Sequence, residues 1–208
     1  MSAPVRRIAG PTLVLPVDDV DTDQIIPARF LTTTERAGLG RHAFAEWRSA
    51  PGSPFDHPQA PSAKVLVAGR NFGCGSSREH AAWALRDYGF EAVLCASLAD
   101  IFRRNALKNG LVALELEPEL HARLTARPGA TVELDLERCE LRLDDGSPAP
   151  FALDAFARQC LLTGLDELGV LLAHEAAISA YERARRERRP GLPSTRASDP
   201  PTTTGAMP

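Results

Sequence analysis

The most constraining feature of this sequence is an alternation of strand-like and helix-like segments between residues 64 and 116. The short apolar runs KVLVAG (64–69), EAVLCA (91–96) and LVALEL (111–116) have the length and composition of buried strands. Residues 77–89 and 99–109 between them are predicted helices, and Gly89 and Gly110 stand where helices commonly stop. Strands that alternate with helices imply parallel pairing through right-handed crossovers. The expected fold class is therefore α/β, with a parallel sheet core flanked by helices.

The segments that follow this core have different patterns. Residues 131–137 (TVELDLE) and 140–143 (ELRL) alternate apolar and polar side chains, which predicts an antiparallel pair with one solvated face. Residues 154–188 read as two helices broken near Gly164, the second with one apolar stripe: Leu168, Leu171, Leu172, Ile178 and Tyr181. We expect one domain over residues 1–189 and a disordered Pro- and Thr-rich tail over residues 190–208.

Charge and hydropathy argue against two classes of partner. The formal net charge is −3, so no basic field gathers nucleic acid, and the arginines of RARRERR (183–189) fit a solvated helix end. No apolar run approaches the roughly 20 residues of a membrane helix, and residues 1–10 lack the apolar core of a secretory signal. A cytoplasmic location is the default expectation.

The four cysteines, Cys74, Cys95, Cys139 and Cys160, form no CxxC pair and have no histidine at ligand spacing. Cys95 and Cys160 lie in apolar surroundings, where a free cysteine packs as a small hydrophobic residue. We therefore expect no metal or cluster site made by this chain alone.

The segment GRNFGCGSSREHAA (69–82) carries the clearest chemical signal. Gly73 and Gly75 allow a ligand to approach the backbone closely, and Ser76 with Glu79 has the spacing of a helix capping box. The amides of the first helical turn would form an anion site, to which Arg78 adds a partner for a carboxylate. A plain cap explains Ser76 and Glu79, but it requires neither the glycines nor an arginine in the first turn. Carboxylate or phosphate binding, with a serine within reach, explains the whole segment.

A second polar segment, VDDVDTDQIIPARF (17–30), gathers Asp18, Asp19, Asp21 and Asp23. Such clusters commonly serve the backbone of a turn. Alternatively, one aspartate orients a catalytic group. The segment lacks the glycine and closing glutamate of a calcium loop.

Together, GRNFGCGSSREHAAWALRDYGF, VDTDQIIPARFL and DIFRRNALKNGL resemble the small subunits of bacterial 3-isopropylmalate dehydratases, in the aconitase superfamily. The likeness runs from about residue 7 to residue 181, with the three motifs in family order; the Pro-rich tail departs from the family. The resemblance implies a swivelling β/β/α domain similar to the last domain of aconitase. It also implies a large-subunit partner that carries a 4Fe-4S cluster, with no cofactor bound by this chain. In this family 2-isopropylmalate loses water to give 2-isopropylmaleate, which is rehydrated to 3-isopropylmalate in leucine biosynthesis.

The same resemblance assigns roles to four residues. Ser76 matches the general base that takes the proton from carbon, and Asp23 matches the aspartate that orients the other active-site groups. Ser77 and Arg78 match the residues that hold a substrate carboxylate. No metal ligand is carried over to this chain.

Several alternatives stay open at this stage. The chain fits the small subunit of a related hydro-lyase, such as homoaconitase or a citraconate or substituted-maleate hydratase, because these share the serine and arginine. In the family the segment FLTTTERAGLG (30–40), with Arg36, faces the variable part of the substrate. Asn105 and Asn109 either contact the site or only end a helix. A non-catalytic module that binds a carboxylate or phosphate is the alternative from another class; the sequence has no P-loop lysine and no GxGxxG motif.

Overall fold

A computed structural model describes residues 3–31 and 35–188 of the chain. The chain divides into two compact units, Met1–Val170 and Leu171–Pro208. The first unit contains the sheet and every predicted site residue. The predicted tail, residues 190–208, lies outside the described residues, so its disorder stays a prediction.

The first unit is built on one seven-stranded sheet with the order β4-β3-β2-β1-β5-β6-β7. Strands β1 to β4 are parallel to one another, and β5 to β7 continue the sheet in antiparallel fashion. The α/β fold class with a parallel core is thus confirmed, as is the antiparallel pair. The strands are β1 (Arg7–Leu15), β2 (Val65–Ala68), β3 (Ala92–Cys95), β4 (Val112–Glu115), β5 (Thr131–Asp135), β6 (Glu140–Arg142) and β7 (Pro148–Pro150).

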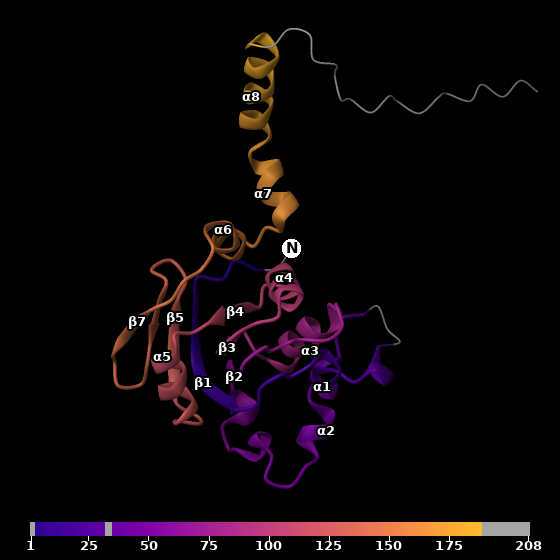
Figure 1. The fold of residues 1–208 in the computed structure, drawn as a ribbon, viewed down its shortest axis with the longest axis vertical. Helices are drawn as coiled ribbons and strands as arrows, with labels where there is room; N and C mark the ends of the chain where they lie inside the picture. The colour runs from indigo at the N-terminus through magenta and orange to yellow at the C-terminus, as the bar shows by residue number, and fades with distance from the viewer. Residues whose placement is uncertain (1–2, 32–34, 189–208) are drawn as a thin grey trace, which may run out of the picture. The chain divides into compact units, whose positions relative to one another are not determined.

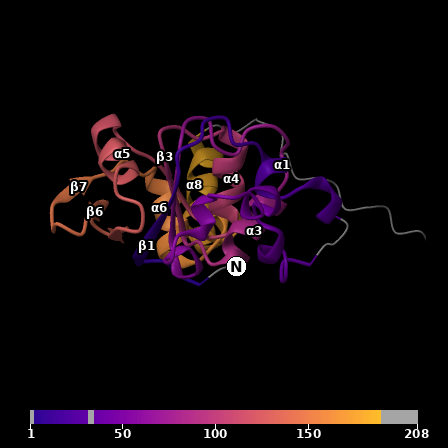
Figure 2. The same ribbon diagram turned by 90° about the horizontal axis from the view of Figure 1, so that it is seen from below.

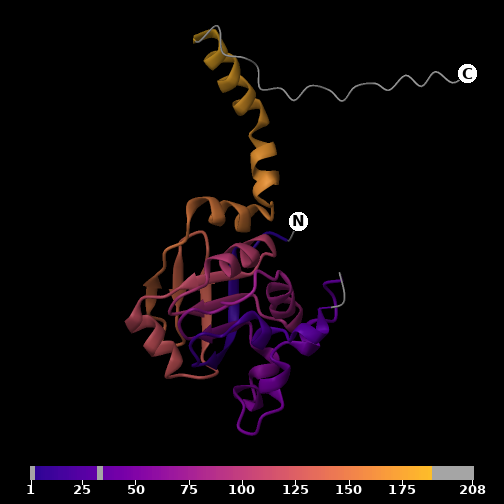
Figure 3. The ribbon, with the colours of Figure 1, turned by 45° about the vertical axis from the view of Figure 1, so that its right-hand side comes forward.

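Strand β1, which the sequence analysis did not predict, joins the two parts of the sheet. Its second half pairs with β2 in parallel from Thr12 to Leu15, and its first half pairs with β5 in antiparallel fashion from Arg7 to Pro11. In Figure 3 the indigo strand β1 runs through the middle of the sheet. The interruption of its apolar pattern by Gly10 and Pro11 falls where its partner changes.

Helices cover both faces of the parallel strands, as Figures 1 and 2 show from two directions. One core contains Leu13, Leu66 and Val93 from the sheet with side chains of α1, α3 and α4; the other contains Val14, Val67 and Leu94 with side chains of α5 and α6. The helices are α1 (Thr22–Ile25), α2 (Ala45–Arg48), α3 (His80–Tyr88), α4 (Asp100–Lys108), α5 (Pro118–Thr125), α6 (Ala155–Thr163), α7 (Glu167–Ala173) and α8 (Glu175–Arg188), with 3₁₀ turns η1 (Ala28–Phe30), η2 (Gly40–His42), η3 (Pro54–Asp56) and η4 (Ala60–Ser62).

The C-terminal helices correct one expectation. The break at Gly164 is confirmed, because this glycine caps α6 in the left-handed conformation. However, the expected second helix is two helices, α7 and α8, which are separated at His174. The predicted apolar stripe is therefore divided between them, and its five side chains are exposed rather than buried.

Among the described residues, no helix is both long enough and apolar enough to cross a membrane.

Candidate active site

The candidate site is the junction between β2 and α3, residues 69–79, at the carboxyl edge of the parallel strands. Gly73 and Gly75 have φ values of +77° and +85°, which side-chain-bearing residues rarely adopt. A Cβ atom on Gly73 would lie 2.3 Å from Cγ of Phe102 on α4. Gly73 is thus required by the close packing of the junction on α4, whereas a Cβ on Gly75 would meet its nearest neighbour, Cβ of Asp21, at an ordinary contact distance of 3.4 Å.

The predicted capping box at Ser76 and Glu79 is wrong. Helix α3 begins at His80, its N-cap is Glu79, and no side chain caps it. The Glu79 carboxylate accepts a hydrogen bond from Nζ of Lys108 at 2.7 Å, and this bond holds the pKa of Glu79 below its usual value. Ser76, Ser77 and Arg78 therefore precede the helix, and their backbone groups do not form its first turn.

The four aspartates of the acidic segment have separate partners. The Asp18 carboxylate accepts hydrogen bonds from the backbone N–H (2.7 Å) and Nε (3.0 Å) of Arg70, which lower the pKa of Asp18. Asp19 accepts a hydrogen bond from Nδ2 of Asn71 at 2.8 Å. These two aspartates fasten the start of the junction to the segment after β1.

Asp21 forms the capping box that was expected elsewhere. Its carboxylate accepts a hydrogen bond from the backbone N–H of Gln24, and the side chain of Gln24 accepts one from the backbone N–H of Asp21. The D-x-x-Q spacing of the sequence carries this signal. The capped helix α1 places Thr22 and Asp23 beside the junction, where Asp21 and Cys74 form a β-bridge.

The structure brings the four predicted site residues together. Ser76, Ser77 and Arg78 are consecutive in the junction, and Nη1 of Arg78 forms an ion pair with Oδ1 of Asp23 from α1. The side chain of Arg78 is 27% exposed and that of Asp23 is 52% exposed. Ser76 and Ser77 are exposed, and within the described residues no hydrogen bond engages either hydroxyl. The junction thus presents two hydroxyl groups and a half-buried guanidinium.

Asn105 of α4 forms a hydrogen bond with this junction, whereas Asn109 forms one with Asn105. Nδ2 of Asn105, a residue only 8% exposed, donates a hydrogen bond to the Ser77 carbonyl at 3.3 Å. Asn109 ends α4; it donates to the Asn105 carbonyl and accepts a hydrogen bond from Nε1 of Trp83. The guanidinium of Arg36 lies 5.0 Å from the centre of the Trp83 ring, so this arginine stacks on α3.

The cysteines and acidic residues do not assemble a metal site. Within residues 3–31 and 35–188, no group of three or more His, Cys, Asp or Glu side chains is arranged to hold a metal ion. Cys74 lies in the junction itself, but burial and the nearby Asp21 and Asp19 raise the pKa of its thiol. Burial likewise raises the pKa of Cys95 to about 12. Among the described residues, these cysteines thus take part in no group of three or more metal-binding side chains.

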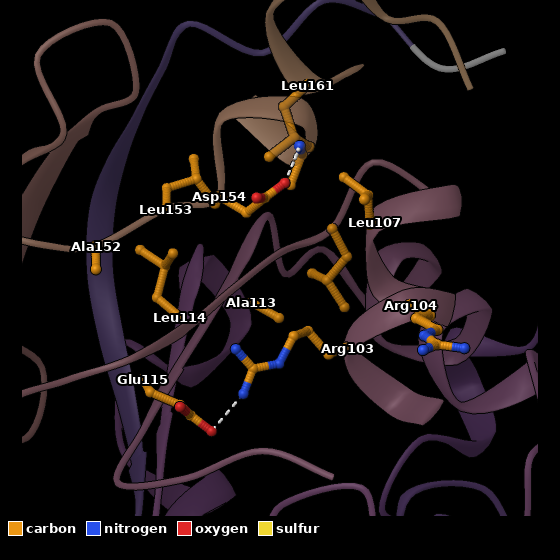
Figure 4. A pocket seen from close by; sticks show the side chains of 12 residues that line it. Arg103, Arg104, Leu107, Ala113, Leu114, Glu115, Ala152, Leu153, Asp154 and Leu161 are labelled. Carbon is orange, nitrogen blue, oxygen red and sulfur yellow. Dashed lines mark hydrogen bonds and ion pairs between the residues drawn. The ribbon is translucent and has the colours of Figure 1, made fainter. Parts of the chain in front are cut away.

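A separate cavity of about 330 Å³ lies at the edge strand β4, between α4 and α6, and contains none of the predicted site residues. Its floor is apolar and includes Leu107, Leu114 and Leu161. Figure 4 shows that three of its charged groups are already engaged, since Arg103 pairs with Glu115 at 2.5 Å and Asp154 caps α6. None of the residues that line this cavity carries a hydroxyl group, whereas the junction presents two.

Comparisons with known proteins bear on the family and fold of the chain. Residues 4–119 match the family model of the aconitase C-terminal domain. The chain is 56% identical over 189 residues to the 3-isopropylmalate dehydratase small subunit of Anaeromyxobacter dehalogenans, an alignment that covers 88% of this chain and 99% of the relative. It is 49% identical over 191 residues to the small subunit from Chloroflexus aggregans, covering 87% and 94% of the two chains.

A solved structure extends the likeness to the fold. The 3-isopropylmalate dehydratase of Methanocaldococcus jannaschii is similar with a TM-score of 0.64 and 32% identity, over 84% of this chain and 99% of that one. The resemblance inferred from the three motifs is thereby confirmed. With the matched fold, motifs and length, the chain belongs to the family of 3-isopropylmalate dehydratase small subunits, in the aconitase superfamily.

Proposed function

We propose that this chain is the serine-bearing subunit of a cytoplasmic hydro-lyase that isomerises 2-isopropylmalate to 3-isopropylmalate through 2-isopropylmaleate. It acts with a large subunit that carries a 4Fe-4S cluster. The observation that carries the proposal is the meeting of Asp23 with Ser76, Ser77 and Arg78, from two segments far apart in the sequence, at the carboxyl edge of the sheet.

Arg78 is suited to bind a substrate carboxylate. Among the described residues only its Nη1 is engaged, by Asp23, so Nη2 and Nε remain as a pair of donors for a planar carboxylate. Asp23 fixes the direction of the guanidinium and thereby acts as the orienting residue. The neighbouring Ser77 hydroxyl provides a further donor on the same exposed surface.

Ser76 is the proposed base. Its oxygen takes the proton from one carbon of 2-isopropylmalate, the electrons of that C–H bond form the double bond, and hydroxide leaves the adjacent carbon. A serine oxygen needs nearby positive charge for this role, because the pKa of a free hydroxyl is far too high, and Arg78 lies two residues away. In the second half-reaction, hydroxide adds to the carbon that lost its proton, and the Ser76 hydroxyl returns its proton to the carbon that lost hydroxide, so that the serine oxygen is regenerated.

The partner would supply what this chain lacks. A 4Fe-4S cluster in the large subunit would supply Lewis-acid chemistry toward the leaving hydroxyl group. The dispersed cysteines of this chain, which form no three-ligand group in the described part, support this division of labour.

The test is reconstitution with a large subunit over a panel of malate and maleate derivatives. We expect no activity from this chain alone and, after mixing, the highest kcat/KM with 2-isopropylmalate. Preference for homocitrate-derived or citraconate-type substrates would instead assign the chain to a related hydro-lyase. Stoichiometric iron and sulfide in the isolated chain after anaerobic reconstitution would contradict the proposed location of the cluster.

A further inference from the structure

The backbone that carries Ser76 directly follows Gly75, with Gly73 close before it, and lies outside regular helix or strand. Residues 71–79 contain no regular helix or strand, and Gly75 precedes Ser76 directly. A catalytic base on a segment without other support would react more slowly, because the reacting atoms must be held within a fraction of an ångström. Some contact must therefore fix the position of Ser76.

Thr22 makes that contact with three hydrogen bonds. Its backbone N–H donates to the Cys74 carbonyl at 3.0 Å. Its hydroxyl accepts a hydrogen bond from the Ser76 N–H at 3.2 Å and donates to the Ser76 carbonyl at 3.2 Å. A threonine hydroxyl has one donor and two acceptor sites, so it can bind both backbone groups at once.

Thr22 is itself held rigidly. It is 2% exposed, it is the first residue of the capped helix α1, and its carbonyl accepts a hydrogen bond from the Ile26 N–H at 3.0 Å. Its neighbour Asp23 pairs with Arg78. One short helix therefore holds both the proposed base and the proposed carboxylate-binding arginine.

We infer that Thr22 is a positioning residue for Ser76, which keeps the serine oxygen at the place where it meets the substrate C–H bond. This inference rests on the proposed role of Ser76. Thr22 does not touch the substrate, so its effect passes through the backbone of Ser76. Because Ser76 is exposed and both hydrogen bonds are only part-buried, we expect water to replace them when the hydroxyl is removed, and we expect the fold to persist.

The test compares Thr22→Val, which keeps the shape and removes the hydroxyl, with Thr22→Ser, which keeps the hydroxyl. Each full-length variant is reconstituted with a large subunit of intact cluster content and assayed with 2-isopropylmalate. We expect Thr22→Val to lower kcat by about 10- to 100-fold with little change in KM. Thr22→Ser should stay within about threefold of the wild type. Wild-type kcat in Thr22→Val, or an equal loss in both variants, would overturn the inference.

A double variant separates positioning from general damage. If Thr22 acts through Ser76, Thr22→Val combined with Ser76→Ala should be no slower than Ser76→Ala alone. A multiplicative loss would show that Thr22 acts by another route. If Thr22→Val does not fold, Thr22→Ala takes its place in the same cycle.

Hydrogen exchange makes the inference testable apart from the proposed function. The Ser76 amide should exchange faster in the Thr22→Val chain than in the wild type and Thr22→Ser chains. Unchanged exchange would refute the hydrogen bond itself. Full activity of Ser76→Ala, together with this faster exchange, would refute the proposed base and leave the contact standing.

Discussion

Two junctions at the same edge of the sheet connect a parallel strand to a helix, and they are built differently. Residues 96–99 lead from β3 to α4 by a short path, and residues 69–79 lead from β2 to α3 by a long one. Neither helix has a side-chain cap. The short path shows how little chain this crossover needs, so the additional residues of the long junction serve something other than topology.

The two junctions also differ in where their polar groups point. In the short junction the N–H groups of Ala96 and Ala99 donate to Gly69 and Phe72 of the long junction, and Ser97 Oγ accepts a hydrogen bond from the Asn71 N–H at 2.8 Å. The short junction is thus a scaffold for the long one. The long junction leaves its two hydroxyl groups exposed, as a substrate-binding segment requires.

Matched serine substitutions should show the largest difference between the two junctions. Ser76→Ala in the long junction removes the proposed base, so kcat should fall by about 10³-fold while KM changes little, because proton transfer occurs only in the transition state. Ser97→Ala in the short junction should leave kcat within about threefold and cost about 1 kcal/mol of stability. Steady-state kinetics of the reconstituted enzymes and thermal melts measure both.

Cluster content and association with the large subunit must match the wild type for this comparison. Near wild-type turnover by Ser76→Ala would remove the serine from the mechanism. An equal loss in both variants would indicate that the whole edge of the sheet had been disturbed.

The next largest effect should be a difference in stability between alanine substitutions at the two glycines of the long junction. Gly73→Ala introduces a Cβ that meets Phe102 at 2.3 Å and requires a positive φ, so it should destabilise the fold by about 3 kcal/mol. At Gly75 the nearest atom would be Cβ of Asp21 at 3.4 Å, so Gly75→Ala should cost only about 1 kcal/mol, from the backbone alone. Urea unfolding of both chains measures the difference; equal costs would show that contact with Phe102 relaxes freely.

Substitution of Arg78 tests whether the long junction binds a carboxylate of the substrate. Arg78→Lys keeps the charge but removes the planar pair of donors, so kcat/KM should fall by about tenfold, mainly through KM. Arg70→Lys at the start of the same junction is the control, because Arg70 pairs with Asp18 and not with Asp23. If both substitutions changed KM equally, general positive charge rather than Arg78 would bind the substrate.

The sequence predicted the position of the long junction, but it did not predict the hydrogen bonds that fix the junction in place. Strand and helix patterns depend on local periodicity, so β2, β3 and β4 and the helix ends at Gly89 and Gly110 could be read directly. The start of α3 was misplaced because the S-x-x-E spacing is local, whereas Glu79 is drawn to Lys108 of the next helix. The role of Thr22 was missed for the same reason, since its partners lie more than 50 positions further along the chain. Long-range hydrogen bonds leave no periodic signal in one sequence.

The smallest expected effect concerns how α3 begins without a cap. The hydrogen bond from Lys108 holds the pKa of Glu79 below 4.5, the value of an unperturbed glutamate. A carboxyl group whose pKa is lower in the folded state stabilises the fold fully above about pH 4.5 and loses that contribution as the pH falls through the folded pKa. Glu79→Gln should therefore cost stability at pH 7, and the cost should shrink at pH 4 and below. Because the side chains of Glu79 and Lys108 are 30% and 57% exposed, we expect less than about 1 kcal/mol.

Urea unfolding at several pH values measures this gap, with Glu119→Gln as the matched control. Glu119 also stands in the first turn of a helix, but it has no ion-pair partner within the described residues. Its substitution should therefore give a smaller gap with little dependence on pH. A gap for Glu79→Gln that stayed constant from pH 7 to pH 4 would show that the side chain acts by packing rather than charge. In that case the start of α3, like that of α4, would be set by the junction's backbone alone.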